Sequence, residues 1–387
     1  MQAVILFLKH LATSFLIAAH AFLAVVLPHP HTAVVVSSLV ATSTSVKPAQ
    51  NFPIGSSEPR QSSASASSTV TTGTPKTATT KAVSVAEILP QSTPQPSPAL
   101  PPSLSAGTVN DIARTAVVNI LCTTKSGGYF EPISGSGVII SSKGIILTNA
   151  HVGQYFLLRD YIVPGNVDCL IRTGSPATEK YHAELLYLPP AWIDANASQI
   201  DAQESMGTGE NDYAFLRITS PINVSTPLPA SFPSVAITLD DPVQNEPVVL
   251  AGYPAGFLGG STIESNLYIT SAISTIENIF AFDDRGYADL VSVGSTVVAQ
   301  AGASGGAIMR QQDGSLQAIV ATASAGTVTS TRDLRGITLE HIDRSLRAAG
   351  MGGITHLVSG DLSQKALDFQ TNTAPAEEQK LINALQK

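Results

Sequence analysis

Short apolar or alternating stretches recur between turn residues from about residue 107 to about residue 350. β-branched residues are frequent in these stretches, and Gly, Pro, Asn or Asp separate them, which is typical of short β-strands. The first set reads AVVNILCTT, GSGVIISS, GIILTNA, NVDCLIRT, KYHAELLYL and DYAFLRIT, and the second reads EPVVLAGYP, LYITSAISTI, DLVSVGST, GGAIMR, LQAIVATAS and GITLEHI. Because closure removes exposed sheet edges, we predict an all-β fold of two six-stranded antiparallel β-barrels.

The N-terminal segment, residues 1–42, contains a run of mostly apolar residues at positions 11–27, preceded by Lys9 and His10. A helix that spans a bilayer needs about 20 apolar residues. A cleavable signal has an apolar region of about 7–15 residues. Both interpretations place the following chain across a membrane with Lys9 inside. We therefore predict a hydrophobic helix that is a signal peptide or a membrane anchor. The chain beyond it is expected to lie outside the cytoplasm and to be anchored to the membrane, or to be secreted if the leader is cleaved.

Residues 43–106 are dominated by Ser, Thr, Pro and Ala, with ten prolines among them. Such a segment has too little apolar surface to offset the entropy of ordering, so we predict a disordered linker. A short helix is expected at TVNDIARTAVVNI, at the start of the folded part. The tail, residues 351–387, is polar; it is expected to hold one amphipathic helix, and no function is assigned to it.

Charge and cysteine content exclude some classes of function. The net charge is −8 and no long basic run occurs, so nothing indicates a nucleic-acid partner. Cys122 and Cys169 fall in different predicted strands, and both a disulfide and two buried thiols fit the sequence. No paired His or Cys spacing resembles a set of metal ligands, and no cofactor is predicted.

The stretch QAGASGGAI places Ser304 among small residues, which suits either a plain tight turn or a nucleophile that a substrate can approach. A serine hydroxyl is a weak nucleophile unless an imidazole takes its proton and a carboxylate orients that imidazole. His151 ends the strand-like KGIILTNAHV, and Asp212 opens NDYAFLRI. His182 lies within an alternating stretch, and two further histidines, His341 and His356, lie in polar segments that are expected to be exposed.

Three motifs together, LTNAHV, NDYAFLRI and GASGGAI, resemble the active-site motifs of the trypsin-like (chymotrypsin-fold) serine peptidases. The longer stretch GSGVIISSKGIILTNAHV is similar to the HtrA-like bacterial branch. The order His, Asp, Ser agrees with this family and differs from that of subtilisins and α/β-hydrolases. The resemblance spans residues 107–350, with an insertion at 190–211 whose role the sequence does not show.

The resemblance implies that the active site lies between the two barrels, with Ser304 as nucleophile, His151 as general base and Asp212 as the residue that orients His151. The backbone N–H groups of Gly302 and Ser304 would form the oxyanion hole. Ala303 stands where digestive relatives carry Asp, so activation by a newly cut N-terminus is not expected.

The substrate pocket is also assigned from the resemblance. Val298 corresponds to the base of the primary specificity pocket, and its lack of charge predicts a small or medium apolar side chain before the cleaved bond. Ala323, Ser324 and Ala325 correspond to the strand that pairs with substrate.

The resemblance therefore predicts a serine endopeptidase that acts on proteins or peptides. HtrA-like proteins usually add a PDZ domain, and this module is expected to be absent here; the oligomeric state stays open. An alternative is a catalytically silent trypsin-fold binding module tethered at the cell surface. A third possibility makes the linker the functional part and the folded domain its cargo.

Overall fold

The computed structural model describes residues 103–125, 132–200, 208–256, 258–323 and 333–386. The predicted anchor or signal at 1–42 and the linker up to residue 102 lie outside these ranges. No helix in the described ranges has both the length and the apolar character needed to cross a membrane.

The first half of the fold is a closed six-stranded antiparallel barrel, as the sequence predicts. Its strands follow one another around the barrel in the order β1, β2, β3, β6, β5 and β4. Their bounds are β1 Val117–Thr124, β2 Ile133–Ser141, β3 Ile145–Thr148, β4 Val167–Thr173, β5 Thr178–Tyr187 and β6 Ala214–Pro221. Cys122 of β1 lies opposite Cys169 of β4, and the two form a disulfide.

The second half is a seven-stranded sheet, so the predicted closed six-stranded barrel is wrong for this half. The strands run in the order β8, β7, β11, β12, β13, β10 and β9 across the sheet. Their bounds are β7 Pro247–Gly252, β8 Thr270–Thr275, β9 Asn278–Phe280, β10 Leu290–Ser292, β11 Ala307–Arg310, β12 Leu316–Ala323 and β13 Leu334–Thr338.

The extra strand, β9, lies directly beyond the predicted strand at 267–276, where the chain changes its pairing partner. The Ile276 N–H donates to the Glu246 carbonyl next to β7, whereas the Glu277 N–H donates to the Ser292 carbonyl of β10. The chain therefore passes from one edge strand, β8, to the other, β9, within two residues. Consecutive Cα atoms are about 3.8 Å apart, so the sheet must curl until its two edges nearly meet.

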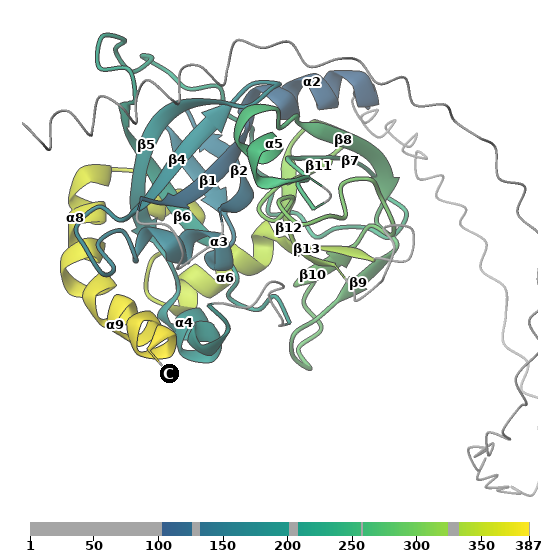
Figure 1. Cartoon of the computed structure of the whole chain (residues 1–387). Helices are drawn as coiled ribbons and strands as arrows, with labels where there is room; N and C mark the ends of the chain where they lie inside the picture. The colour runs from purple at the N-terminus through teal and green to yellow at the C-terminus, as the bar shows by residue number, and fades with distance from the viewer. Residues whose placement is uncertain (1–102, 126–131, 201–207, 257, 324–332, 387) are drawn as a thin grey trace, which may run out of the picture. The chain divides into compact units, whose positions relative to one another are not determined.

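Two helices flank the sheets. α2 (Ala106–Ala116) begins at the last residue of the predicted linker and is capped by the Ser105 side chain, which accepts from the Thr108 N–H. α6 (Leu339–Ala348) follows β13 and lies between the closed barrel and the seven-stranded sheet (Figure 1). Shorter helical segments complete this part of the chain: α3 Ala150–Gly153, η1 Gln154–Phe156, α4 Pro190–Asn196, η2 Ala197–Gln199 and α5 Gly260–Ser265.

The C-terminal tail contains three helices rather than the one expected: α7 Gly353–Leu357, α8 Leu362–Asn372 and α9 Ala374–Leu385. α8 lies against the closed barrel (Figure 1), where Phe369 packs on Tyr187 and Gln370 Nε2 donates to the Leu185 carbonyl at 3.1 Å. α9 contacts the helical insertion through an ion pair between Lys380 and Asp194. The tail therefore covers one side of the barrel.

Candidate active site

His151 and Asp212 are in direct contact. His151 lies in α3, directly after β3, and Asp212 lies two residues before β6, the strand that pairs with β3. His151 Nδ1 is 2.8 Å from Asp212 Oδ2, and the His151 backbone N–H donates to Asp212 Oδ1 at 3.0 Å. The Asp212 side chain is 6% exposed, and a buried carboxylate requires such partners. The pairing fixes the orientation of the imidazole.

The backbone on both sides of this pair is also held by hydrogen bonds. Asn149, fully buried at the start of α3, donates from Nδ2 to the Asp212 carbonyl at 2.9 Å. Gln154 Nε2 donates to the His151 carbonyl at 3.0 Å. Asn149 thus links the helix that carries His151 to the segment that carries Asp212, a contact that the sequence motifs alone did not indicate.

The turn that carries Ser304 depends on two glycines with left-handed backbone. Gly302 has φ +89°, and a Cβ there would lie 2.7 Å from the Tyr253 carbonyl oxygen. Gly305 has φ +83°, and its Cβ would lie 2.1 Å from the Ser136 carbonyl oxygen. Residues with side chains are disfavoured at such φ values, and contacts this short exclude a Cβ.

Ser136 of β2 connects the Ser304 turn to the closed barrel. Its N–H donates to the Ser304 carbonyl at 2.7 Å, and its hydroxyl donates to the Gly302 carbonyl at 2.7 Å. The Ser136 carbonyl accepts from the Thr148 hydroxyl at 2.7 Å, three residues before His151. Strands β2 and β3 therefore position the Ser304 turn and the His151 helix on the same part of the barrel.

Along the Ser304 turn, backbone N–H groups that donate a hydrogen bond alternate with N–H groups that do not. The Ala303 N–H donates to the Gln300 carbonyl and the Gly305 N–H donates to the Val320 carbonyl. Within the described ranges, the N–H groups of Gly302 and Ser304 have no such acceptor. In the same ranges, no hydrogen bond joins the Ser304 hydroxyl to the His151 ring. The structure thus brings His151 and Asp212 into contact and connects Ser304 to them through backbone and strand contacts.

The residues assigned to the substrate pocket are described only in part. Val298 is fully buried, in an apolar cluster of the second half that also includes Ala303. Ala323 is the last residue of β12, whereas Ser324 and Ala325 lie outside the described residues. The insertion at 190–211 forms α4 and η2, and its residues 201–207 lie outside the described ranges.

His341 forms a second His–Asp pair that the sequence did not predict. The expectation that His341 is exposed is wrong, because the residue is 8% exposed and packs edge-to-face on Phe282. Its Nδ1 is 2.9 Å from Asp289 Oδ1, and its Nε2 is buried with no hydrogen-bond partner in the described structure. Burial lowers the pKa of His341, and the Asp289 carboxylate opposes this shift only in part.

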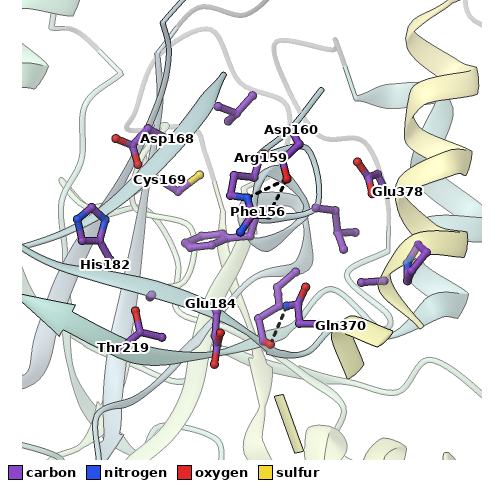
Figure 2. Close-up of a pocket in the computed structure, with 16 residues that line it drawn as sticks. Phe156, Arg159, Asp160, Asp168, Cys169, His182, Glu184, Thr219, Gln370 and Glu378 are labelled. Carbon is purple, nitrogen blue, oxygen red and sulfur yellow. Dashed lines mark hydrogen bonds and ion pairs between the residues drawn. The ribbon is translucent and has the colours of Figure 1, made fainter. Parts of the chain in front are cut away.

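A separate cavity of about 640 Å³ lies between the closed barrel and helices α8 and α9 (Figure 2). Figure 2 shows Arg159 and Asp160 joined by an ion pair there, with Glu378 on the neighbouring helix. Burial raises the pKa of Glu378, and repulsion from Asp160 adds to the effect. His151, Asp212 and Ser304 are not among the residues that line this cavity. The described residues contain no group of three or more His, Cys, Asp or Glu side chains suited to a metal ion.

Comparison with solved structures finds proteases with low sequence identity. A serine endoprotease from Yersinia pestis is 20% identical, with a TM-score of 0.38, over 64% of this chain and 65% of that chain. A protease from M. tuberculosis in its active form is 18% identical, with a TM-score of 0.38, over 70% and 96%. The HtrA-type protease AlgW with a tripeptide is 20% identical, with a TM-score of 0.40, over 64% of each chain. The match thus spans just under two thirds of the Y. pestis and AlgW chains.

Comparison with curated protein sequences gives no match. Residues 135–319 match the family model of the trypsin-like peptidase domain, and this range contains His151, Asp212 and Ser304. The closed barrel, the curled second sheet and the His–Asp pair described above are consistent with that match. Residues 135–319 are therefore similar to a trypsin-like peptidase domain.

Proposed function

We propose that the chain is a serine endopeptidase that cleaves proteins or peptides through an acyl-enzyme on Ser304. His151 takes the Ser304 proton as the hydroxyl oxygen attacks the substrate carbonyl, and later donates it to the leaving amine. Asp212 holds the imidazole in the required tautomer and stabilises its cationic form. The observation that carries the proposal is the 2.8 Å contact between His151 Nδ1 and the buried Asp212 carboxylate, within the range that matches the trypsin-like peptidase domain.

The oxyanion of the tetrahedral intermediate would be stabilised by the N–H groups of Gly302 and Ser304. The left-handed Gly302 backbone and the lack of an acceptor for either N–H among the described residues support this assignment. Preorganised donors of this kind contribute because they need no reorganisation when charge develops on the oxygen.

The substrate preference is proposed to be a small or medium apolar side chain before the cleaved bond. Val298 supports this, since it is uncharged and lies in an apolar cluster close in sequence to the Ser304 turn. Cleavage of an internally quenched peptide series that differs only at this position tests the preference. Preferential cleavage after Arg or Lys would contradict it.

The peptidase domain is proposed to lie outside the cytoplasm, membrane-anchored or secreted. Two observations support this: the apolar run at residues 11–27, and the Cys122–Cys169 disulfide, since disulfides persist mainly in oxidising compartments. Protease accessibility of the domain in intact cells would test the location.

Labelling with a fluorophosphonate probe tests the catalytic assignment. Wild-type protein should become covalently labelled, and Ser304→Ala should lose the label because the nucleophilic oxygen is removed. Ser363→Ala, at an exposed position in α8, is the matched control and should retain full labelling. His151→Ala should label far more slowly. Folded wild type that stays unlabelled would contradict the proposal and favour a binding module.

A further inference from the structure

The two residues on either side of Asp212 both contact one serine of a distant helix. The Tyr213 hydroxyl donates to Ser345 Oγ at 2.9 Å, and Ser345 Oγ donates to Asn211 Oδ1 at 3.2 Å. Ser345 lies in α6, 132 residues along the chain from Tyr213. A single hydroxyl therefore acts as acceptor for one neighbour of Asp212 and as donor to the other.

These contacts hold a segment that contains a left-handed residue. Asn211 has φ +61°, a left-handed value that is uncommon for residues other than glycine and that Asn tolerates better than most. Tyr213 is fully buried, and burial raises the pKa of its phenol, so the hydroxyl stays protonated and able to donate. Without Ser345, the Tyr213 hydroxyl would be left in the interior without its acceptor, and such unpaired groups favour rearrangement.

Helix α6 is itself firmly anchored in the second half of the fold. Its N-cap Thr338 accepts from the His341 N–H, and Leu339, Ile342 and Leu346 are fully buried. The helix contacts β12 and β13 on that side, and reaches the segment before β6 through Ser345 (Figure 1). Ser345 thus joins the second half of the fold to the residue that orients His151.

We propose that Ser345 is a positioning residue that holds Asp212 where its carboxylate accepts the hydrogen bond from His151. This inference rests on the proposed function of the same site. Ser345 contacts neither His151 nor the place where substrate reacts, and it acts through Asn211 and Tyr213. If the hydroxyl is removed, Asp212 is held less firmly, by Asn149 and His151 without the support of its two neighbours, and the imidazolium that forms during the reaction loses part of its stabilisation.

The test compares Ser345→Ala with Ile342→Val, which removes one buried methylene from the same helix and leaves the hydrogen bonds intact. Small misplacement of a catalytic group can cost about a hundredfold in rate, so we expect a ten- to hundredfold lower kcat in Ser345→Ala with little change in KM. The acidic limb of the pH–rate profile should move to lower pH, because a displaced carboxylate stabilises protonated His151 less. Ser345→Thr keeps the hydroxyl and should restore both properties.

A structural role alone would give a different result. In that case Ser345→Ala and Ile342→Val would both lose stability, while kcat and the midpoint of the acidic limb stayed at the wild-type values, and the proposal would be overturned. Tyr213→Phe removes only one of the two hydrogen bonds and should fall between wild type and Ser345→Ala.

Failure of the proposed function can be told apart from failure of this inference. Unlabelled wild type in the fluorophosphonate assay would refute the peptidase assignment. The His151 ring signals in NMR can be followed against pH without turnover. A lower titration midpoint in Ser345→Ala than in wild type supports the positioning role, and an unchanged midpoint overturns it.

Discussion

Replacing Gly302 with Ala tests the proposed oxyanion hole through its backbone. The new Cβ would lie 2.7 Å from the Tyr253 carbonyl oxygen and 3.0 Å from Ala255 Cβ. Neither contact is with the end of a flexible side chain, so the turn itself must move. The left-handed φ of +89° adds a strain of about 1–2 kcal/mol for a residue with a Cβ.

The expected effect on catalysis is larger than the effect on stability. If the Gly302 N–H turns away from the oxyanion, the transition state loses about 2.7–4 kcal/mol, which corresponds to a roughly 10²–10³-fold lower kcat. The assay is initial-rate kinetics on an internally quenched peptide, together with urea unfolding of the same preparations.

Gly360→Ala is the matched control. Gly360 also has a left-handed φ, +70°, but an added Cβ there has no heavy atom within 4 Å. This variant should show the strain cost alone, with wild-type kinetics. The reasoning is refuted if Gly302→Ala loses stability as Gly360→Ala does but keeps a kcat within about threefold of wild type.

Three further predictions concern stability. Arg172 is 1% exposed and donates to Asn119 Oδ1 and to two carbonyls of α5. Arg172→Met should therefore lower the free energy of unfolding, measured by urea titration, by about 3–5 kcal/mol, and a loss below about 1 kcal/mol would contradict this. Burial lowers the pKa of His341, so the unfolded state takes up a proton first as pH falls below about 6.5. Stability should therefore decline below that pH, and His341→Gln should flatten the decline in thermal melts; an equal slope in both proteins would refute it. Replacing Cys122 and Cys169 together with Ala should cost about 2–4 kcal/mol of stability in urea titrations, and wild type in a reducing agent should match the double variant.

The closed barrel could be predicted from the sequence because each of its strands is an uninterrupted apolar or alternating stretch with turn residues at its ends. The second sheet could not, because LYITSAISTI shows no local sign that pairing changes at Ile276. The backbone hydrogen bonds of Ile276 to Glu246, next to β7, and of Glu277 to Ser292 of β10 reveal the change.

The candidate site was predictable from motifs, and its supports were not. The three motifs select His151, Asp212 and Ser304; the structure places His151 Nδ1 against Asp212 Oδ2, and the catalytic roles stay a prediction. Ser345 has no local motif, since its partners lie more than 130 residues away.

The same limit applies elsewhere in the chain. His341 sits in a polar stretch, and its burial depends on Asp289 and Phe282 from another part of the fold. The tail does show helical spacing of Leu362, Ala366 and Phe369, but the barrel surface that covers them is not visible in the sequence.

The bonds of Ser136 have a consequence for how the protein loses activity. The Ser304 turn is hydrogen-bonded to β2 through Ser136 and to β12 through the Gly305 N–H, so its conformation depends on both halves of the fold. Unfolding or displacement of either half would therefore distort this turn. Heating or denaturant should therefore abolish the proposed peptidase activity in a single step, together with loss of the fold. A fragment that contains only one half should have no peptidase activity.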